Sequence, residues 1–453
     1  MRMGMGLARG ARRVFAAVLF FLFPFIVFSL LAGCPSSPSE AGPEDGAAGL
    51  SAGGDAGAGG EGSFVLPGLG SDFVFAVSNP SIFWEPQPGG GEIQVQVSRS
   101  AEFAEGTILL DARTAASGLR LGLGLEESSA FFLRARPVGF FGGDWGPAVR
   151  ISYKPLDIAM RQVKDCEMAV YEMTNGLLAE IVNRLLPGGE ISVSGGMLRG
   201  KDGTPYLGLG ELNYGFQFGL ELLQEEDRPG VYALAPKAGR GEHPAVGLSW
   251  YGAAFICDSL SRMFGYRPAY ARIAPGVTAD AEGGGFRMPA EAEWDYAARG
   301  PDAFAYPGGA KTLDPRSANY LRSGDPFESL GRDSVSAGGP TSPAGFYDGM
   351  EKDGYKTVNG VSPLGLHDML GNVWEWCDDV FAGEGENAAE GEAPQDAGRF
   401  RVVRGGAWNT RRADLSLGSR GWYKAEGFSY SLGLRLARKK EFTTDSTDGG
   451  GKE

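Results

Sequence analysis

The chain has 453 residues, of which 43% are hydrophobic, so it is long enough for two or three domains with sizeable cores. Its formal net charge is −14, and the four arginines among the first 33 residues leave the remainder near −18, which argues against a nucleic-acid-binding protein because such proteins need a basic surface. The 73 glycines and 27 prolines predict many turns and loops, and the two histidines, His243 and His367, limit any histidine-based metal or acid–base chemistry.

The N-terminus is predicted to be an export signal. Residues 1–33 combine four arginines with an almost purely apolar run from Val14 to Leu31, followed by Ala32 and Gly33 before Cys34. This pattern resembles a bacterial lipoprotein signal in which Cys34 carries the lipid, and the alternative is an uncleaved signal anchor. In the first reading the mature protein is exported and anchored to a membrane without spanning it. The absence of Asp at position 35 favours the outer membrane or cell surface over the inner membrane.

Two further segments precede the main domain. Residues 34–62 are rich in Gly, Ala and Ser, with almost no large apolar side chain, which predicts a flexible linker. Residues 63–155 alternate polar with apolar residues and predict a small β-sandwich with turns about every ten residues. Its expected strands are Ile82–Trp84, Glu92–Ser98, Phe131–Arg136 and Val149–Tyr153. The pattern resembles a fibronectin type III domain, a module that usually serves as a spacer or binding platform.

Residues 156–438 form the main predicted domain, which mixes helices with strands. Three helices are expected, each with a recognisable start signal. The first begins after Thr174. The second covers Tyr251–Met263 and follows Ser249. The third begins after Pro289 and ends at Gly300. Residues 200–203 predict a hairpin turn. Residues 382–398 are expected to be an acidic loop and 439–453 a disordered tail.

The stretch Leu364–Trp376 is predicted to organise this domain. Trp374 and Trp376 are large enough to anchor a core. Asp368 and Glu375, joined by a glycine-containing turn, could hold a hard cation through oxygen ligands. Equally, from chemistry alone, the two acids could be solvated residues beside an aromatic core.

Seven segments, in one order along 156–438, carry a resemblance to the formylglycine-generating enzyme family, also called the sulfatase-modifying-factor family. They read YEMTN, HPAVGLSWYGAAFICDSL, FRMPAEAEWDYAARG, ANY, SPLGLHDMLGNVWEW, RVVRGGAW and GLRLA. The resemblance implies an α+β, C-type-lectin-like fold with two main helices, short strands and much irregular chain. Members of the family include copper-dependent oxidases that convert a sulfatase cysteine to formylglycine, iron-dependent sulfoxide synthases, and binding proteins with no catalysis.

The chain departs from the catalytic members at the metal ligands. The copper oxidases use two cysteines after the RVVRGGAW segment, and those positions are Thr410 and Leu415 here; Cys377 is the last cysteine of the chain. Copper(I) needs thiolate ligands, so formylglycine oxidase activity is expected to be absent. Two isolated histidines cannot supply the iron site either, so neither copper nor iron is expected. A smaller departure is Ala290, where the family has a capping Thr; such a loss costs about 1 kcal/mol.

The resemblance does carry over structural calcium. It implies one site with the side chains of Asp368 and Glu375 and the backbone carbonyls of Gly371 and Val373. A second site would use the side chain of Asn319 and the carbonyl of Tyr320, with further ligands within 325–340 such as Asp333 and Val335. Oxygen ligands and an exported compartment both favour calcium.

Other residues of interest have structural and functional readings. Cys166, Cys257 and Cys377 could include one disulfide, or could all be buried free thiols. His243, before a proline at a helix entrance, is expected to be structural, and His367 could orient Asp368 or be partly exposed. By analogy with the lectin-like fold, a ligand-binding face is predicted from four residues: Arg411, Arg420, Trp422 and Tyr423.

The leading hypothesis is a lipid-anchored, non-catalytic binding or structural protein of a bacterial cell envelope. Its expected partners are the membrane, through Cys34, and an unidentified surface ligand or envelope protein, with no nucleic acid. The alternative is an oxidoreductase of the same family with unrecognised chemistry, using a thiol such as Cys377 or an added metal. A third hypothesis is a scaffold for a surface assembly that docks through the β-sandwich.

Overall fold

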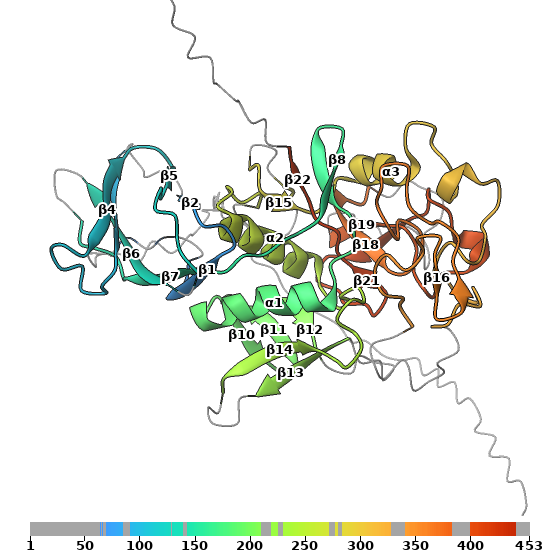
Figure 1. Cartoon of the computed structure of the whole chain (residues 1–453), viewed down its shortest axis with the longest axis horizontal. Helices are drawn as coiled ribbons and strands as arrows, with labels where there is room; N and C mark the ends of the chain where they lie inside the picture. The colour runs from blue at the N-terminus through green and yellow to red at the C-terminus, as the bar shows by residue number, and fades with distance from the viewer. Residues whose placement is uncertain are drawn as a thin grey trace, which may run out of the picture. The chain divides into compact units, whose positions relative to one another are not determined.

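A computed structural model describes the residues 64, 66, 69–84, 91–127, 129–138, 143–209, 219–224, 230–270, 277–279, 283–327, 340–382 and 399–440 (Figure 1). The contacts divide the chain into two units, residues 1–59 and 60–453. The predictions for the export signal, for Cys34, for the linker and for residues 383–398 and 441–453 lie outside the described residues. Within the described ranges, no helix is long and apolar enough to cross a membrane.

The part before residue 155 is built from seven described strands. They are β1 (Asp72–Phe75), β2 (Ser81–Phe83), β3 (Glu92–Ser98), β4 (Ile108–Thr114), β5 (Gly118–Arg120), β6 (Ala130–Val138) and β7 (Val149–Tyr153). The four predicted strands are present as β2, β3, β6 and β7. Strands β1, β4 and β5 were not predicted; β1 and β5 are too short for a clear alternating pattern.

Five of these strands form one sheet, in the order β1-β7-β6-β3-β4, and β2 pairs with β5 separately. Strand β1 runs parallel to β7, and the other pairs of the large sheet are antiparallel. One face of the large sheet is fully buried through Val95, Leu133 and Ile151. The predicted β character is thus confirmed. The fibronectin type III assignment stays a prediction, because the five-and-two division differs from the four-and-three division of immunoglobulin-like sandwiches.

The other face of this sheet carries a polar ladder across three strands. The two side-chain amides of Gln94 and Gln96 donate to the two carboxylate oxygens of Asp111, at 2.6 and 2.8 Å. Arg134 donates to Gln96 Oε1 at 2.7 Å, and its guanidinium lies 4.3 Å from the ring centroid of Trp145. Hydrogen bonds and cation–π contacts therefore hold these side chains in one arrangement on the sheet.

The described residues after 155 contain three α-helices and fifteen strands. The helices are α1 (Asn175–Leu185), α2 (Trp250–Phe264) and α3 (Glu291–Arg299), with short 3₁₀ segments at Leu186–Gly188, Pro307–Gly309 and Arg412–Asp414. The strands are β8 (Met160–Val163), β9 (Cys166–Ala169), β10 (Ile191–Ser194), β11 (Met197–Gly200), β12 (Pro205–Gly208), β13 (Leu220–Gln224), β14 (Tyr232–Pro236), β15 (Phe286–Arg287), β16 (Glu351–Lys352), β17 (Tyr355–Lys356), β18 (Trp374–Val380), β19 (Phe400–Arg404), β20 (Arg420–Lys424), β21 (Leu432–Gly433) and β22 (Ala437–Lys439).

Two four-stranded sheets lie at the centre of this part. One has the order β15-β22-β9-β8, so β22, its last strand in the chain, lies between β15 and β9, and the other has the order β20-β19-β18-β21. The strands β10-β11-β12 and the pair β13-β14 lie on the side of α1 (Figure 1). The side chain of Asn183 on α1 donates to the carbonyl of Leu234 at 2.8 Å and accepts from its N–H at 2.7 Å, which joins α1 to β14.

The predicted helix starts are confirmed. Thr174 Oγ1 accepts from the N–H of Leu177 at 3.2 Å, and Ser249 Oγ accepts from that of Gly252 at 3.0 Å. Helix α3 begins after Ala290, which has no hydroxyl to offer. Instead, the carboxylate of Asp379 accepts from the N–H of Glu291 at 2.6 Å. A side chain distant in sequence thus satisfies one of the amide groups at the helix start.

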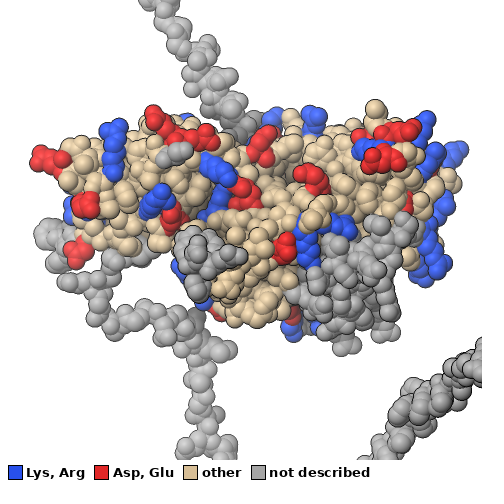
Figure 2. All heavy atoms as spheres, turned by 60° about the horizontal axis from the view of Figure 1, so that its bottom comes forward, with Lys and Arg blue, Asp and Glu red and all other residues tan. Residues whose placement is uncertain are grey.

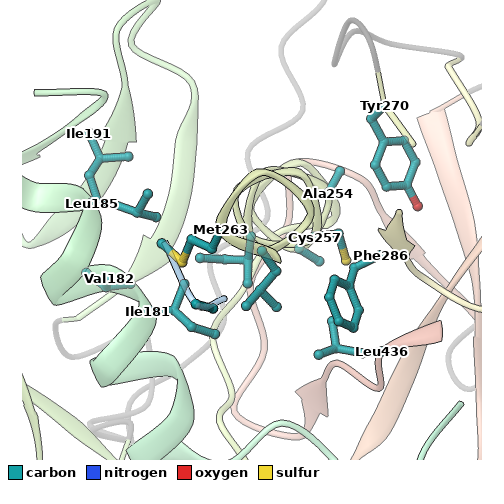
Figure 3. Close-up of a cluster of buried hydrophobic side chains, with 14 of the residues drawn as sticks. Ile181, Val182, Leu185, Ile191, Ala254, Cys257, Met263, Tyr270, Phe286 and Leu436 are labelled. Atoms are coloured by element: carbon teal, nitrogen blue, oxygen red, sulfur yellow. The ribbon is translucent and has the colours of Figure 1, made fainter. Parts of the chain in front are cut away.

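The main core surrounds α2 (Figure 3). Met263 faces α1 and its Ile181, whereas Cys257 lies on the opposite side of α2 near Phe286, with Leu436 beyond it. All five side chains are buried. Because α2 is apolar on both sides, it is an interior helix with the other elements packed around it.

Charged side chains on the surface are mixed in sign. Figure 2 shows acidic and basic residues interspersed among uncharged ones on the face that it draws. Several form exposed pairs, such as Arg150 with Asp72 at 2.8 Å and Lys154 with Glu180 at 2.6 Å. Pairs of this kind contribute about 0–1 kcal/mol each, so the stability of the domain depends mainly on its interior.

Asp258 on α2 is predicted to make stability depend on pH. It is buried, its carboxylate accepts from the N–H of Tyr270 at 2.9 Å, and burial raises its pKa from 3.8 to about 7 although Arg262 opposes the shift. Because the folded pKa lies above the unfolded value, the folded state holds this proton more tightly. The resulting stability is present below the unfolded pKa and is lost as the pH rises through the folded pKa.

The expected result is that Asp258→Asn, compared with the unsubstituted protein, becomes progressively more stabilising as the pH rises through this window. Urea unfolding measured at several pH values checks this, with Asp302→Asn at an exposed position as the control. A stability difference for Asp258→Asn that is constant with pH would contradict the assignment.

Candidate functional site

The turn within Leu364–Trp376 depends on four residues with left-handed backbone. Gly365 has φ +83°, Asp368 +57°, Gly371 +81° and Asn372 +58°. Asp and Asn are the non-glycine residues that best tolerate this conformation. At Gly371 space is also restricted, because a Cβ atom there would lie 2.1 Å from the carbonyl oxygen of Asn319. That same oxygen accepts from the N–H of Asn372 at 2.8 Å, so the two stretches with predicted calcium ligands are in direct contact.

Glu375 forms a fully buried ion pair with Arg435. Arg435 Nη2 donates to Glu375 Oε1 at 2.6 Å, and Arg435 Nε donates to Oε2 at 2.9 Å. The indole of Trp294 donates to Oε2 at 2.6 Å. Both residues of the pair are 0% exposed. Since both carboxylate oxygens already accept hydrogen bonds, Glu375 could ligate a cation only by giving up part of this arrangement.

Glu172 is the carboxylate on the other side of the same turn. It is 2% exposed, and its Oε2 accepts from Asn372 Nδ2 at 2.7 Å. Its Oε1 has no hydrogen-bond partner among the described residues, and the same holds for the buried hydroxyl of Ser342. Asn372 lies between them, because its Oδ1 accepts from the N–H of Ser342 at 3.0 Å.

Acidic side chains outnumber basic ones at this centre. Three carboxylates, Glu172, Asp368 and Glu375, are buried with a single guanidinium, Arg435. Burial raises the pKa of Glu172 well above its ordinary value, and the charges of Asp368 and Glu375 add to the effect. Burial also raises the pKa of Asp368 to about 6, against a hydrogen bond that its carboxylate accepts from the N–H of Gly345. Carboxylate oxygens are the type of ligand that a hard cation prefers.

The remaining predicted calcium ligands are found in varied surroundings. The side-chain amide of Asn319 donates to the carbonyl of Pro340 at 2.8 Å, and the carbonyl of Tyr320 accepts from the N–H of Ser323 at 3.1 Å. Val373 is fully buried. Asp333 and Val335 lie outside the described residues. The described ranges contain no group of three His, Cys, Asp or Glu side chains placed to hold a metal, so calcium at either site stays a prediction.

Thr410 and Leu415, the two residues at the positions of the family's copper-binding cysteines, have structural roles in this chain. Thr410 Oγ1 accepts from the N–H of Ala407 at 2.9 Å, which closes a turn. Leu415 is 1% exposed and belongs to the second core cluster. An aliphatic side chain in a core and a hydroxyl in a turn provide no soft ligand for copper.

The three described cysteines are all free and buried, so the reading as free thiols holds for them. Burial raises the pKa of the Cys166 thiol to about 12 and those of Cys257 and Cys377 well above the ordinary value. Cys377 is fully buried in a core cluster with Trp294. A buried thiol that resists ionisation is a poor nucleophile.

The two histidines occupy different environments. His243 is buried, its Nδ1 lies 3.0 Å from a guanidinium nitrogen of Arg240, and burial lowers its pKa to about 4. It is therefore neutral at ordinary pH, and its structural role stays a prediction. His367 is half-buried against the ring of Tyr171, at 5.0 Å between ring centroids, and its carbonyl accepts from Arg435 at 2.8 Å.

Of the four residues predicted to form a ligand-binding face, Arg420 and Trp422 lie on one face of β20, where both contact the ring of Phe381. Arg420 pairs with Glu291 at 2.6 Å, and Trp422 packs on Phe400 with ring centroids 4.9 Å apart. Tyr423 lies on the opposite face of β20, where its hydroxyl donates to the carbonyl of Phe428 at 3.0 Å. Arg411 is exposed and pairs with Asp414 at 2.6 Å.

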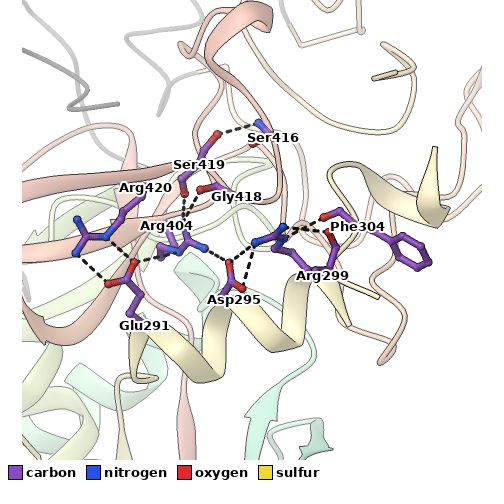
Figure 4. Close-up of polar contacts among 10 residues, drawn as sticks. Glu291, Asp295, Arg299, Phe304, Arg404, Ser416, Gly418, Ser419 and Arg420 are labelled. Atoms are coloured by element: carbon purple, nitrogen blue, oxygen red, sulfur yellow. Dashed lines mark hydrogen bonds and ion pairs between the residues drawn. The ribbon is translucent and has the colours of Figure 1, made fainter. Parts of the chain in front are cut away.

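Sequence reasoning missed a polar network between α3 and the strands β19 and β20 (Figure 4). Buried Arg404 pairs with Asp295 and donates to the carbonyls of Gly418 and Ser419 at 2.8 and 2.7 Å. Glu291, one turn before Asp295, holds Arg420. The spacing of the two acids on one helix face was the available signal. The network holds the loop before β20 against α3.

Comparison with known proteins identifies related sequences. The profile of the family described as "Sulfatase-modifying factor enzyme 1-like domain" matches residues 159–440, more than half of the chain. The chain is 30% identical over 228 residues to the serine/threonine-protein kinase pkn1 of Chlamydia caviae, covering 48% of this chain and 28% of that protein. It is 30% identical over 198 residues to the formylglycine-generating enzyme of Thermomonospora curvata, covering 40% and 51% respectively. The chain therefore spans only about a quarter to a half of the length of these relatives.

A solved structure, that of PvdO from Pseudomonas aeruginosa, aligns with a TM-score of 0.37 at 19% identity. The alignment covers 65% of this chain and 85% of that one.

Proposed function

The chain belongs to the family of sulfatase-modifying factor enzyme 1-like domains, and from this membership we propose that it is an exported, lipid-anchored, non-catalytic binding or structural protein of a bacterial cell envelope. The observation that carries the proposal is the pair of residues at the copper-cysteine positions. Thr410 closes a turn and Leu415 fills a core, so both positions contribute to the fold and supply no thiolate. The proposal includes a C-type-lectin-like fold for this domain and a fibronectin-like spacer before it.

Copper and iron do not fit the residues present. The described cysteines are buried in the interior, and the two histidines have different neighbours, Arg240 for His243 and Tyr171 for His367. The competing hypothesis is an oxidoreductase with unrecognised chemistry that uses a thiol such as Cys377 or an added metal. The burial of Cys377 disfavours the thiol form of this hypothesis.

Oxygen uptake tests the absence of oxidase activity. The full-length protein in detergent is incubated with copper and a peptide containing the CxPxR motif, and a catalytically competent member of the family serves as the positive control. No uptake above the peptide-and-copper background is expected. Copper-dependent oxygen consumption with formation of an aldehyde on the peptide would overturn the proposal.

Lipid anchoring through Cys34 makes a separate prediction. Cys34→Ala is expected to move the protein from the membrane fraction to the soluble fraction, or to leave an unprocessed precursor, because the acylated cysteine is the proposed attachment point. Metabolic labelling with a radioactive fatty acid should mark the unsubstituted protein and not the variant. Label retained by Cys34→Ala would contradict the prediction.

Calcium is the cation that the proposal assigns to the family's sites. It is supported by the excess of buried carboxylates around Asp368 and by the contact between Asn319 and Asn372. In the proposed role calcium is structural: it would neutralise charge and fix the turn that carries Trp374 and Trp376.

A further inference from the structure

The outer face of the five-stranded sheet carries three arginines close together. Arg113 lies on β4, and Arg134 and Arg136 lie on β6, with β3 between these two strands. In the register of the sheet, Gln94 on β3 has Arg113 on one side and Arg136 on the other. Gln96 is opposite Arg134. All three arginines therefore share the face that points away from the core, and this cluster is opposite in sign to the chain as a whole, whose net charge is −14.

Two of these arginines are oriented by the polar ladder. The carboxylate oxygens of Asp111 accept from the amides of Gln94 and Gln96, so the carbonyl oxygens of both glutamines are directed to β6. There Gln94 Oε1 accepts from Arg136 Nε at 3.0 Å, and Gln96 Oε1 accepts from Arg134 Nε at 3.0 Å. Because the glutamines are only 6 and 7% exposed, the ladder is a fixed support beneath the two guanidinium groups.

Aromatic rings complete this support. The guanidinium groups of Arg134 and Arg136 lie 4.3 and 4.5 Å from the ring centroid of Trp145, and that of Arg134 lies 4.0 Å from the ring centroid of Phe103. The segment with Trp145 is itself held on β6, where the N–H of Gly146 donates to the carbonyl of Ala135 at 2.8 Å. The rings and the amides are neutral, so they fix the positions of the two cations without supplying a counter-charge.

The three positive charges are not balanced on the sheet. Within the described ranges, none of the three arginines forms an ion pair, and the exposed Glu92 on the same face forms none either. Both oxygens of Asp111 already accept from the glutamine amides. Burial lowers the pKa of Arg134, and the charge of Arg136 lowers it further against the attraction of Asp111. Two cations held side by side in this way favour an anionic partner from outside the sheet.

The spacing of the arginines indicates what shape this partner has. Neighbouring strands are about 4.8 Å apart, so Arg113 and Arg136 are separated by about 10 Å across the sheet. Arg134 and Arg136 are two residues apart on one strand, or about 7 Å. The site is an open sheet face, whereas bound peptides add to a strand edge or enter a groove. A linear polymer with oxyanion groups at intervals of this size can lie across such a face.

We propose that the outer face of this sheet binds an anionic polysaccharide, with Arg113, Arg134 and Arg136 as the groups that contact its carboxylate, phosphate or sulfate oxygens. The planar guanidinium matches such oxyanions through paired N–H donors. This inference rests on the proposed function, because it takes the polysaccharide from the cell envelope in which the protein is proposed to reside. It gives the part before residue 155 a binding role in addition to that of a spacer.

Binding to immobilised polysaccharides tests the inference. The full-length protein in a non-ionic detergent is applied to polygalacturonate, which carries carboxylates, and to dextran sulfate, with uncharged dextran as the blank. Poly-L-glutamate represents an acidic protein partner. The variants are Arg113→Gln, Arg136→Gln and the double variant. Arg120→Gln, at an exposed position on β5 in the separate two-stranded sheet, is the matched control. Dissociation constants are measured by biolayer interferometry at several NaCl concentrations, and thermal unfolding checks that each variant is folded.

The unsubstituted protein is expected to bind at least one of the two anionic polysaccharides and not the uncharged dextran. Each arginine-to-glutamine change should weaken binding at low salt by about three- to tenfold and reduce the slope of log Kd against log salt by about 1, because one fewer charge on the polymer is neutralised. Arg120→Gln should leave both quantities unchanged. Arg113→Gln is the safest variant for folding, since Arg113 is exposed and has no side-chain hydrogen bond within the described ranges.

Arg136→Lys separates recognition by geometry from attraction by charge. Lysine keeps the charge and lacks the planar pair of donors, so the salt slope should stay the same while the affinity falls. Which of the two polysaccharides binds more tightly identifies the oxyanion.

Three results would overturn the inference. The first is no binding to either anionic polysaccharide. The second is equal binding by the unsubstituted protein and the double variant. The third is tighter binding to poly-L-glutamate, which would assign the face to an acidic protein. The oxygen-uptake and fatty-acid labelling experiments involve none of these arginines, so a failure of the proposed function would be recognised separately.

Discussion

Replacing Arg435 with methionine is expected to lower the free energy of unfolding by about 3–5 kcal/mol, because it leaves the carboxylate of Glu375 buried without its counter-ion. Both residues are 0% exposed, so water cannot replace the lost partner. Arg435 also donates to the carbonyls of Ala169, Val170 and His367, and those acceptors would lose their hydrogen bonds at the same time. Urea unfolding followed by tryptophan fluorescence measures the loss.

The matched control is Arg411→Met, which breaks an exposed pair with Asp414 and should change the free energy of unfolding by less than about 1 kcal/mol. The double variant Glu375→Gln/Arg435→Met should recover part of the loss, since it removes the stranded charge. A cost below about 1 kcal/mol for Arg435→Met would show that the pair is hydrated in solution.

Gly371→Ala is expected to lower the free energy of unfolding by about 2–5 kcal/mol, because two effects add at one position. Its φ of +81° is unfavourable for any residue with a Cβ, at about 1–2 kcal/mol. In addition, the Cβ would lie 2.1 Å from the carbonyl oxygen of Asn319, so the backbone must shift, which typically costs a further 1–3 kcal/mol or so. The shift would separate Asn319 from Asn372, whose N–H donates to that oxygen.

Gly354 supplies a close control for this prediction. It also has φ +81°, yet a Cβ there would meet no atom within 4 Å. Gly354→Ala should therefore show the conformational cost alone, about 1–2 kcal/mol. Denaturant midpoints of the two variants give the comparison. Equal costs would mean that the close approach at Gly371 is relieved without loss of stability.

The helices could be predicted because their signals are local. Thr174 and Ser249 stand directly before apolar residues at helical spacing, and Gly265 and Gly300 stand at the helix ends. The start of α3 shows the limit of this reasoning. Ala290 predicts a missing cap, but the compensating carboxylate is that of Asp379, 88 residues after Glu291, whose N–H it accepts from. No periodicity links two such positions.

The candidate site was only partly accessible from the sequence for the same reason. The stretch Leu364–Trp376 could be singled out from its Trp, Asp, Glu and Gly content. Its partners could not be identified: Glu172 is 200 residues away from Asn372, and Arg435 is 60 residues beyond Glu375. Two buried acids of the same chemical type differ in their partners, since Glu375 is neutralised by a guanidinium and Glu172 is not. That difference exists only in three dimensions.

The neighbouring placement of β9 and β22 has a consequence for how the chain folds. Cys166 pairs with Lys439 and Met168 with Ala437, so the sheet that begins the family domain is completed by its last strand. A ribosome-bound chain that lacks those last residues cannot form this sheet or bring Arg435 to Glu375. Contacts of such long sequence separation also slow folding, because loop closure must precede the energetic gain. The domain should therefore fold only after β22 has left the ribosome, and a truncation that removes Ala437–Lys439 should leave it unfolded.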